Sequence, residues 1–277
     1  MASEIVKVET PRLHQSTATV LINKSPLHAW YKQFGGAVEE YDENRNLGSL
    51  CHALLLGGED IVEVAAKDWR TNAAKEERDA AIAAGKIPVL SHKLAEAEAL
   101  ADKVRVFLAK KTIILGGESE MSVKWETPGG VACEGRLDHF QLYSGMIYDF
   151  KFCASAAKRV CENKFIEFGY DIQHAAYVQA IETLYPELAG KVSMEFIFVE
   201  TEPPHAIRIM PVAGTMRTSG QWRWARACEI WSECLESFGT ETPWPAYEDD
   251  GEAAECPAWA LNAQLVQEEI HQREVAQ

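Results

Sequence analysis

The segment that most constrains the fold is GRLDHFQLYSGMIYDFKF, residues 135–152, which reads as two apolar strands around a short turn. Successive side chains of a strand point to opposite faces of its sheet. Asp149 and Lys151 therefore share one face, and the aromatic residues that alternate with them form the other. Charged groups are costly inside a sheet unless they are paired. The pattern predicts a hairpin with one core face and one face that carries an acid and an amine.

Asp138 lies on the preceding strand, and a turn through residues 143–145 can bring it beside Asp149. Cross-strand neighbours lie ~4–5 Å apart, and two carboxylates at that separation repel each other unless a cation lies between them. Hard cations such as Mg²⁺ prefer oxygen ligands, and the adjacent Lys151 can hold a water nucleophile or stabilise phosphorane-like charge. The hairpin therefore predicts a metal-dependent phosphodiester hydrolysis site. The alternative is a solvated strand face with an Asp–Lys pair.

Other residues along the chain could complete such a site. Glu120 lies on a predicted strand, and Glu118 is a rival candidate because the two share the same strand parity. Gln173 and Tyr177 are four residues apart on a predicted helix over 164–185, so they project from one helix face. We expect this helix to pack on the charged sheet and to present both side chains to the site.

Composition and charge limit the class of protein. The chain has 277 residues and a formal net charge of −15, which excludes a broadly basic nucleic-acid coat but not a local basic surface. The N-terminus lacks a signal-peptide pattern, and no apolar run approaches the ~20 residues that cross a bilayer. We expect a soluble, cytoplasmic protein. The chain has 7 cysteines and no CxxC motif, which favours reduced, buried thiols over a zinc ribbon or an iron–sulfur cluster.

The order of patterns predicts an α/β fold with a helical N-terminal portion. We expect one domain over residues 1–247 and an acidic tail over 248–277 with a short helix near residue 260. Residues 68–86 fit either a helix or a mobile surface segment. Predicted helices span 16–36, 46–58, 91–111 (with Ser91 as N-cap), 164–185 and 219–238, and predicted strands span 119–125, 131–142, 145–154, 191–200 and 206–212.

The order of these motifs resembles the PD-(D/E)xK nuclease superfamily in its RecB-like branch. It is most similar to phage and prophage exodeoxyribonuclease VIII (RecE-type) enzymes. The similarity spans residues 16–200 and rests on an ordered set rather than on DxK alone. The matching motifs are SPLHAWY (25–31), LGSLCHALLLG (47–57), an acidic strand residue, GRLD (135–138), DFK (149–151) and GYDIQHAAY (169–177).

The resemblance implies a central mixed sheet that is flanked by helices. It also implies bound Mg²⁺ or Mn²⁺, and two ions are expected. The implied metal ligands are Asp138, Asp149, the carbonyl of Phe150, Glu120 and His52. Lys151 would orient or activate water, while Gln173 and Tyr177 would support the site and touch DNA. For His52 the alternative is a satisfied core histidine on a leucine-rich helix. One departure is that Phe152 and Cys153 follow the lysine where the family usually has threonine.

An acidic protein needs local positive charge to hold DNA. Residues 203–228 contain several arginines and no acid, and Trp222 and Trp224 among them could stack on unpaired bases, although the alternative for the tryptophans is helix core. Lys158 and its basic neighbours follow the active-site strand. The candidate DNA-binding residues are Arg136, Lys158, Arg159, Lys164, Arg217, Arg223 and Trp222. For Arg136 the alternative is a salt bridge to the acidic tail.

The resemblance implies an exonuclease that digests double-stranded DNA ends 5′ to 3′ and leaves a 3′ single strand for a single-strand annealing protein in phage-type recombination. It also implies a toroidal homo-oligomer in the cytoplasm of a bacterial host. A Cas4-like single-strand nuclease is a second hypothesis, although the spacing of Cys228, Cys234 and Cys256 does not match its cysteine set. The third is a non-catalytic DNA-binding or annealing-partner module on the same fold, against which the intact Asp138, Asp149 and Lys151 argue.

Overall fold

The computed structural model describes residues 10–36, 43–57, 60–247, 251 and 253–275. The chain divides into two compact units, Met1–Pro245 and Ala246–Gln277. The second unit contains helix α9 (Ala258–Val275). Among the helices described, none joins sufficient length to sufficient apolarity to cross a membrane.

A five-stranded mixed sheet forms the centre of the first unit, in the order β3-β4-β5-β6-β7. Neighbouring strands are antiparallel except for β5 and β6, which run parallel. This architecture confirms the predicted α/β fold with a central mixed sheet. The strands are β3 (Glu118–Glu126), β4 (Ala132–Gln141), β5 (Met146–Cys153), β6 (Ser193–Glu200) and β7 (Ile207–Pro211).

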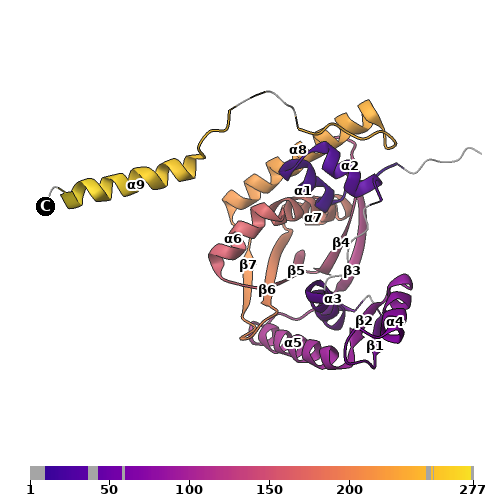
Figure 1. Ribbon diagram of the computed structural model, residues 1–277. Coiled ribbons are helices and arrows are strands. Elements are labelled where there is room, and N and C mark those ends of the chain that lie inside the picture. The colour runs from indigo at the N-terminus through magenta and orange to yellow at the C-terminus, as the bar shows by residue number, and fades with distance from the viewer. Residues whose placement is uncertain (1–9, 37–42, 58–59, 248–250, 252, 276–277) are drawn as a thin grey trace, which may run out of the picture. The chain divides into compact units, whose positions relative to one another are not determined.

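Helices cover both faces of this sheet (Figure 1). The face that carries Phe196 and Phe198 shares its core with α1 (Gln15–Asn23), α2 (Pro26–Phe34), α6 (Lys158–Glu167), α7 (Tyr170–Leu184) and α8 (Gly214–Phe238). The opposite face packs on α3 (Glu43–Leu56) and α5 (Ser91–Lys110). A short 3₁₀ turn, η1 (Pro186–Leu188), follows α7.

A small parallel pair, β1 (Ile61–Val64) and β2 (Ile87–Leu90), lies beside α3 and α5 and was not among the predicted strands. Helix α4 (Asn72–Ala83) connects the two strands, as a parallel crossover requires. It begins with Thr71 as N-cap, whose side chain accepts a hydrogen bond from the Ala74 backbone N–H at 3.2 Å. The helical alternative for residues 68–86 is therefore the correct one.

Strand β5 alternates as its sequence predicts. Tyr148 and Phe150 belong to the core shared with α3 and α5, and Ile147 belongs to the core shared with α7 and α8. Asp149 points toward α7, where it accepts a hydrogen bond from Gln173. The charged face of the hairpin is therefore covered by a helix and is not a solvated surface.

Two of the predicted helices are each broken in two. The helix expected over 16–36 stops at Asn23, and a second one begins at Pro26, which has no backbone N–H and is favoured in the first turn of a helix. The helix expected over 164–185 is preceded by α6 and interrupted at Gly169, whose φ is +70°. A side chain at this left-handed position would be strained, so glycine marks the break.

The predicted N-cap of the long helix at 91–111 was also wrong. Leu90 occupies the N-cap position of α5, and Ser91 is the first helical residue. The Ser91 hydroxyl instead lies 3.5 Å from the backbone carbonyl of Val64 on β1. The serine therefore links the start of α5 to the small parallel sheet rather than capping the helix.

Candidate active site

A cleft of about 1210 Å³ opens where β4 and β5 part. Its lining includes residues from α3, β4, β5 and the start of α7, so distant parts of the chain meet there. Among them are His52, Arg136, Asp138, Lys151 and Tyr170.

The cleft begins where the β4–β5 ladder ends, at the pair His139↔Tyr148. Beyond this pair the backbone N–H of Phe150 donates a hydrogen bond of 2.7 Å to Asp138 Oδ2 instead of to a strand carbonyl. On the neighbouring strand β3, Glu120 has a φ of +53°, a left-handed conformation that costs energy in any residue with a side chain. Such strain is concentrated at functional sites, and here it falls beside Asp138.

His52 of α3 lies between two carboxylates. Its Nδ1 is 2.8 Å from Glu120 Oε1, and its Nε2 is 2.7 Å from Asp138 Oδ2. Burial lowers the pKa of His52, but hydrogen bonds to Asp138 and Glu120 outweigh that effect and raise it to about 10. Glu118 is exposed, so the structure places Glu120 and not Glu118 at the site. The charged imidazole balances the negative charge of Glu120 and Asp138.

The same three side chains fit a divalent cation. The ligand atoms of His52, Glu120 and Asp138 lie within 4.8 Å of one another. Glu120 Oε1 and Asp149 Oδ1 are buried beside His52 Nδ1 and Lys151 Nζ, and a carboxylate oxygen with one such neighbour still has a second lone pair for an ion. An imidazole binds a metal only when neutral, so His52 must release a proton if it is a ligand. Phe150, whose carbonyl is a predicted ligand, lines the same cleft.

Fully buried Asp149 and half-buried Lys151 form an ion pair, with Nζ 2.5 Å from Asp149 Oδ1. The other oxygen accepts a hydrogen bond of 2.5 Å from the Gln173 side-chain amide. Burial and the negative charge of Asp138 raise the pKa of Asp149 to about 7. Burial lowers the pKa of Lys151, but the carboxylates of Asp149 and Asp138 outweigh it and hold that pKa above its usual range. Lys151 is therefore an ammonium group at neutral pH.

Tyr170 contributes to the site and was not among the predicted site residues. The ammonium of Lys151 lies 4.7 Å from the centre of its ring, a cation–π contact. Tyr170, Gln173 and Tyr177 are three and four residues apart, so the helix places all three on one side. The spacing GYxxQxxxY could have revealed Tyr170, because its first tyrosine belongs to the same face.

Gln173 and Tyr177 support the site from behind rather than lining the cleft. The Tyr177 hydroxyl donates a hydrogen bond of 2.9 Å to the backbone carbonyl of Arg136. A Cβ at Gly135 would lie 2.7 Å from the Tyr177 ring, which explains the glycine of GRLD. The Arg136 Nε lies 2.9 Å from Glu120 Oε2, so this arginine pairs with one of the site acids.

The predicted DNA-binding residues fall into exposed and buried groups. Arg136 is more than half exposed at the cleft, and Lys158 and Arg159 are exposed at the start of α6. Lys164, on the last turn of α6, is half-buried. On α8, Arg217 is exposed and Trp222 is 67% exposed. Trp224 is buried and forms part of the helix core.

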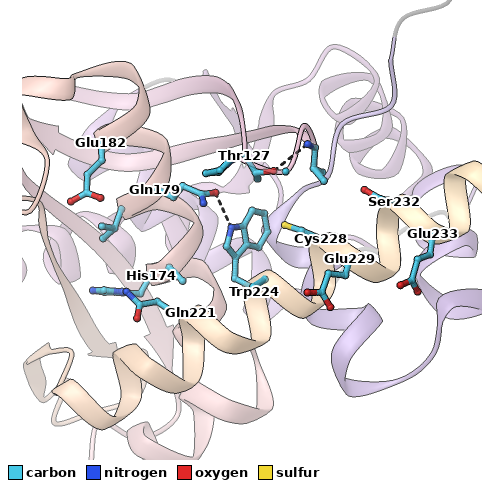
Figure 2. Close-up of a pocket in the computed structure, with 16 residues that line it drawn as sticks. Thr127, His174, Gln179, Glu182, Gln221, Trp224, Cys228, Glu229, Ser232 and Glu233 are labelled. Carbon is cyan, nitrogen blue, oxygen red and sulfur yellow. Dashed lines mark hydrogen bonds between the residues drawn. The ribbon is translucent and has the colours of Figure 1, made fainter.

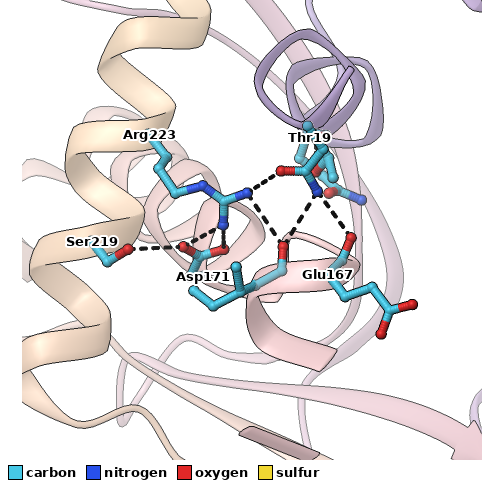
Figure 3. A network of polar contacts seen from close by, with 8 residues as sticks. Thr19, Glu167, Asp171, Ser219 and Arg223 are labelled. Atoms are coloured by element: carbon cyan, nitrogen blue, oxygen red, sulfur yellow. Dashed lines mark hydrogen bonds and ion pairs between the residues drawn. The ribbon is translucent and has the colours of Figure 1, made fainter. Parts of the chain in front are cut away.

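Arg223 does not fit its predicted role at a DNA surface (Figure 3). Its Nη1 lies 2.7 Å and 2.8 Å from the two oxygens of Asp171, which is fully buried. Its Nη2 donates to the side-chain oxygen of Asn23 and to the backbone carbonyl of Ile166. The guanidinium therefore joins α8 to α7, α1 and α6 in the interior, where no phosphate reaches it.

The cysteines do not form a metal site in the described part of the chain. The only group of three His, Cys, Asp or Glu residues found there with metal-ligand spacing is His52, Glu120 and Asp138. All seven cysteines are free thiols, and all but Cys256 are buried. This arrangement gives no support to the four-cysteine cluster of a Cas4-like nuclease.

Comparison with known proteins agrees with this geometry. The profile of a PDDEXK-like domain of unknown function (DUF3799) matches residues 16–242. A provisionally assigned exonuclease from Eubacterium rectale has a similar structure, with a TM-score of 0.58 at 14% identity over 95% of this chain and 97% of that one. A phage-related exonuclease from Haemophilus somnus 129PT matches with a TM-score of 0.36 at 12% identity, over 82% of this chain and 96% of that one.

No curated protein matches the sequence. The Eubacterium structure supports the fold, whereas the Haemophilus likeness is too low to support an argument. The family match covers most of the chain, including every segment that contributes to the cleft. The predicted PD-(D/E)xK resemblance is thus confirmed, and the chain belongs to the PDDEXK-like family DUF3799.

Proposed function

We propose that this protein is a divalent-metal-dependent exonuclease that hydrolyses phosphodiester bonds of double-stranded DNA from its ends. The observation that carries the proposal is that His52, Asp138 and Lys151 line one cleft, while Glu120 contacts His52 and Asp149 contacts Lys151 directly behind it. The fold shared with the Eubacterium protein, named as an exonuclease, supports the same reading.

The residues of the chain divide the chemistry between them. A bound Mg²⁺ or Mn²⁺ would neutralise phosphate charge and lower the pKa of coordinated water. Asp138, Asp149, Glu120 and His52 would hold one or two such ions, together with the carbonyl of Phe150. Lys151, which stays protonated, would donate a hydrogen bond to the attacking water or to the developing negative charge on phosphate. Tyr170 and Gln173 would keep the ammonium and carboxylate in place.

The finer proposal is digestion in the 5′ to 3′ direction, which leaves a 3′ single strand for an annealing protein in phage-type recombination. The proposed DNA contacts are half-buried Lys164 and five exposed residues: Arg136, Lys158, Arg159, Arg217 and Trp222. We also propose a closed homo-oligomer around the DNA, and bacterial cytoplasm as its location. The negative net charge of −15 suits a ring whose positive groups face inward.

The test uses linear duplex DNA labelled at one end, with and without a 5′-phosphate, in Mg²⁺. Wild-type protein should release nucleotides from the 5′ end and leave covalently closed circles intact. Glu120→Gln should abolish release, because it removes a charge from the proposed metal site. Glu118→Gln is the matched control, since it neutralises an exposed acid on the same strand. Full activity of Glu120→Gln, or cutting of closed circles at the same rate, would refute the proposal.

A further inference from the structure

A second pocket, of about 710 Å³, is lined by residues of α7 other than Tyr170, Gln173 and Tyr177, which support the catalytic site (Figure 2). Helices α7 and α8 and the turn between β3 and β4, residues 127–131, form its walls. Its volume falls within the ~300–1,000 Å³ typical of ligand pockets. None of the residues assigned to the cleft lines it, so it is a separate site.

The floor of this pocket presents an unused hydrogen-bond donor. Gln179 Oε1 accepts hydrogen bonds from the indole N–H of Trp224 at 2.9 Å and of Trp125 at 3.3 Å. Indole nitrogen only donates, so these bonds identify the oxygen of the amide and direct its NH₂ elsewhere. Among the described residues no acceptor contacts that NH₂ group. A carbonyl oxygen of an occupant would satisfy it.

A buried imidazole in the wall also lacks a partner. His174 is 6% exposed, and within the described structure its Nδ1 has no hydrogen-bond partner. A buried nitrogen left unpaired costs roughly 1–3 kcal/mol, which a polar group of an occupant would recover. Burial, helped by the nearby positive charge of Arg217, lowers the pKa of His174 to about 4. The ring is therefore neutral at pH 7 and does not repel a cation.

The charge of the pocket favours a cationic occupant. Its ionisable lining groups besides His174 and Cys228 are the carboxylates of Glu182, Glu229 and Glu233, and the lining contains no lysine or arginine. Arg226 lies outside the lining, 2.9 Å from Glu229 and 3.9 Å from Glu233. Three carboxylates against the guanidinium groups of Arg226 and of Arg217, which lies near His174, leave one net negative charge around the pocket. Trp224, Val178 and Val131 supply apolar surface beneath it.

We propose that this pocket docks a basic segment of a partner protein, in which a lysine or arginine alternates with apolar residues. The cationic head group would lie at Glu229 and Glu233, and its aliphatic stem would pack on Trp224. A backbone carbonyl of the segment would accept from Gln179. The segment would thus lie against the outer side of the helix whose inner side supports Asp149.

The experiment pans a random hexapeptide library on the full-length protein and measures the Kd of the enriched consensus peptide by fluorescence anisotropy. The expected consensus contains Lys or Arg beside Leu, Met or Phe. Ala225→Phe fills the pocket from an exposed position on α8 without removing a polar group, and it should weaken binding more than about tenfold. Glu229→Gln with Glu233→Gln should weaken binding at least about fivefold at low salt.

The matched control is Glu236→Gln, which neutralises an exposed acid on α8 outside the pocket and should leave the Kd within about twofold. Three results would overturn the proposal: no consensus, a neutral or acidic consensus, or equal binding by Ala225→Phe. A change in oligomeric mass of Ala225→Phe in sedimentation would also overturn it, because the occupant would then be a second copy of the chain. Nuclease assays of the same variants keep this test separate from that of the proposed function.

Discussion

Gln173 donates a hydrogen bond of 2.5 Å to one oxygen of Asp149, while Lys151 lies 2.5 Å from the other. A buried carboxylate held at both oxygens has one orientation, and this orientation points its unused lone pairs in a fixed direction. Gln173 is therefore a positioning residue whose effect reaches the reaction through Asp149.

Replacing Gln173 by alanine should lower kcat about 10- to 100-fold, because supporting residues of a metal ligand have effects of this size. KM for DNA should change little, since Gln173 is buried behind the cleft. The loss of the hydrogen bond should also shift the acid limb of the pH–rate profile, as Asp149 loses a donor that stabilises its charged form. Thr183→Ala, at an exposed position of the same helix, is the control. Unchanged kcat in Gln173→Ala would contradict this role.

Metal binding should release protons. With a pKa of about 10, His52 is protonated at pH 7 and must become neutral to bind an ion. We expect about one proton from His52, and up to about half a proton from Asp149, whose pKa is about 7. Titrating Mn²⁺ in two buffers of different ionisation enthalpy measures the number. The His52→Gln variant should lose the larger part of this proton release. If the variant released as many protons as the wild-type protein, His52 would not be a ligand.

The same raised pKa makes the stability of the metal-free protein depend on pH in a defined direction. Because the folded-state pKa of His52 lies above its unfolded value of about 6.5, its contribution to stability is complete below pH 6.5 and is lost as pH rises through about 10. In EDTA, the wild-type midpoint of urea unfolding should therefore fall more between pH 7 and pH 10 than that of His52→Gln. Parallel curves for the two proteins would contradict this effect.

His174 should change the pH dependence of stability in the opposite direction, so that stability falls as the pH is lowered. Its folded-state pKa of about 4 lies below the unfolded value of about 6.5, so the unfolded chain binds the extra proton between these limits. Stability should fall by about 2 kcal/mol between pH 7 and pH 5 because of this residue, and His174→Gln should lack that part of the slope. Exposed His92→Gln is the control. The measurement is urea unfolding at the two pH values.

Loss of Arg223 should affect folding rather than DNA affinity. Arg223→Ala leaves Asp171 charged, buried and without its guanidinium, which typically costs about 3–5 kcal/mol. Arg226→Ala, which breaks an exposed pair on the same helix, should cost no more than about 1 kcal/mol. Restored stability in the double variant Arg223→Met, Asp171→Leu would identify the unpaired charge as the cause. A normal melting temperature for Arg223→Ala would contradict the interpretation.

The sequence predicted the sheet and its charged face because alternation is a local property. Asp149 and Lys151 could be placed on one side of β5 without knowing the rest of the fold. Breaks within apolar helical patterns were harder to predict from the sequence. Gly169, for example, interrupts its helix at a close contact with Thr19 that only the tertiary structure reveals.

The wrong prediction on α8, that of Arg223 as a DNA contact, arose because the burial of a residue depends on partners elsewhere in the chain. Arg223 and Trp222 are adjacent in a basic stretch, yet one is buried and the other exposed. The partner that buries Arg223 is Asp171, which lies on another helix. Strands β1 and β2 were missed because they are only 4 residues long and separated by a helix, so neither shows a period of its own. Glu118 and Glu120 have the same position in the strand alternation, so the sequence could not decide which of them belongs to the site. The strained φ of Glu120, which the alternation does not predict, separates the two in the structure.

His52 comes from the first quarter of the chain, whereas Asp138, Asp149 and Lys151 come from its middle. A nascent or partly folded chain that has formed the hairpin but not docked α3 would hold its acids without their histidine. If the proposed activity is correct, nuclease activity would arise only at the last stage of folding, and host DNA would not be cut while the polypeptide is still being made.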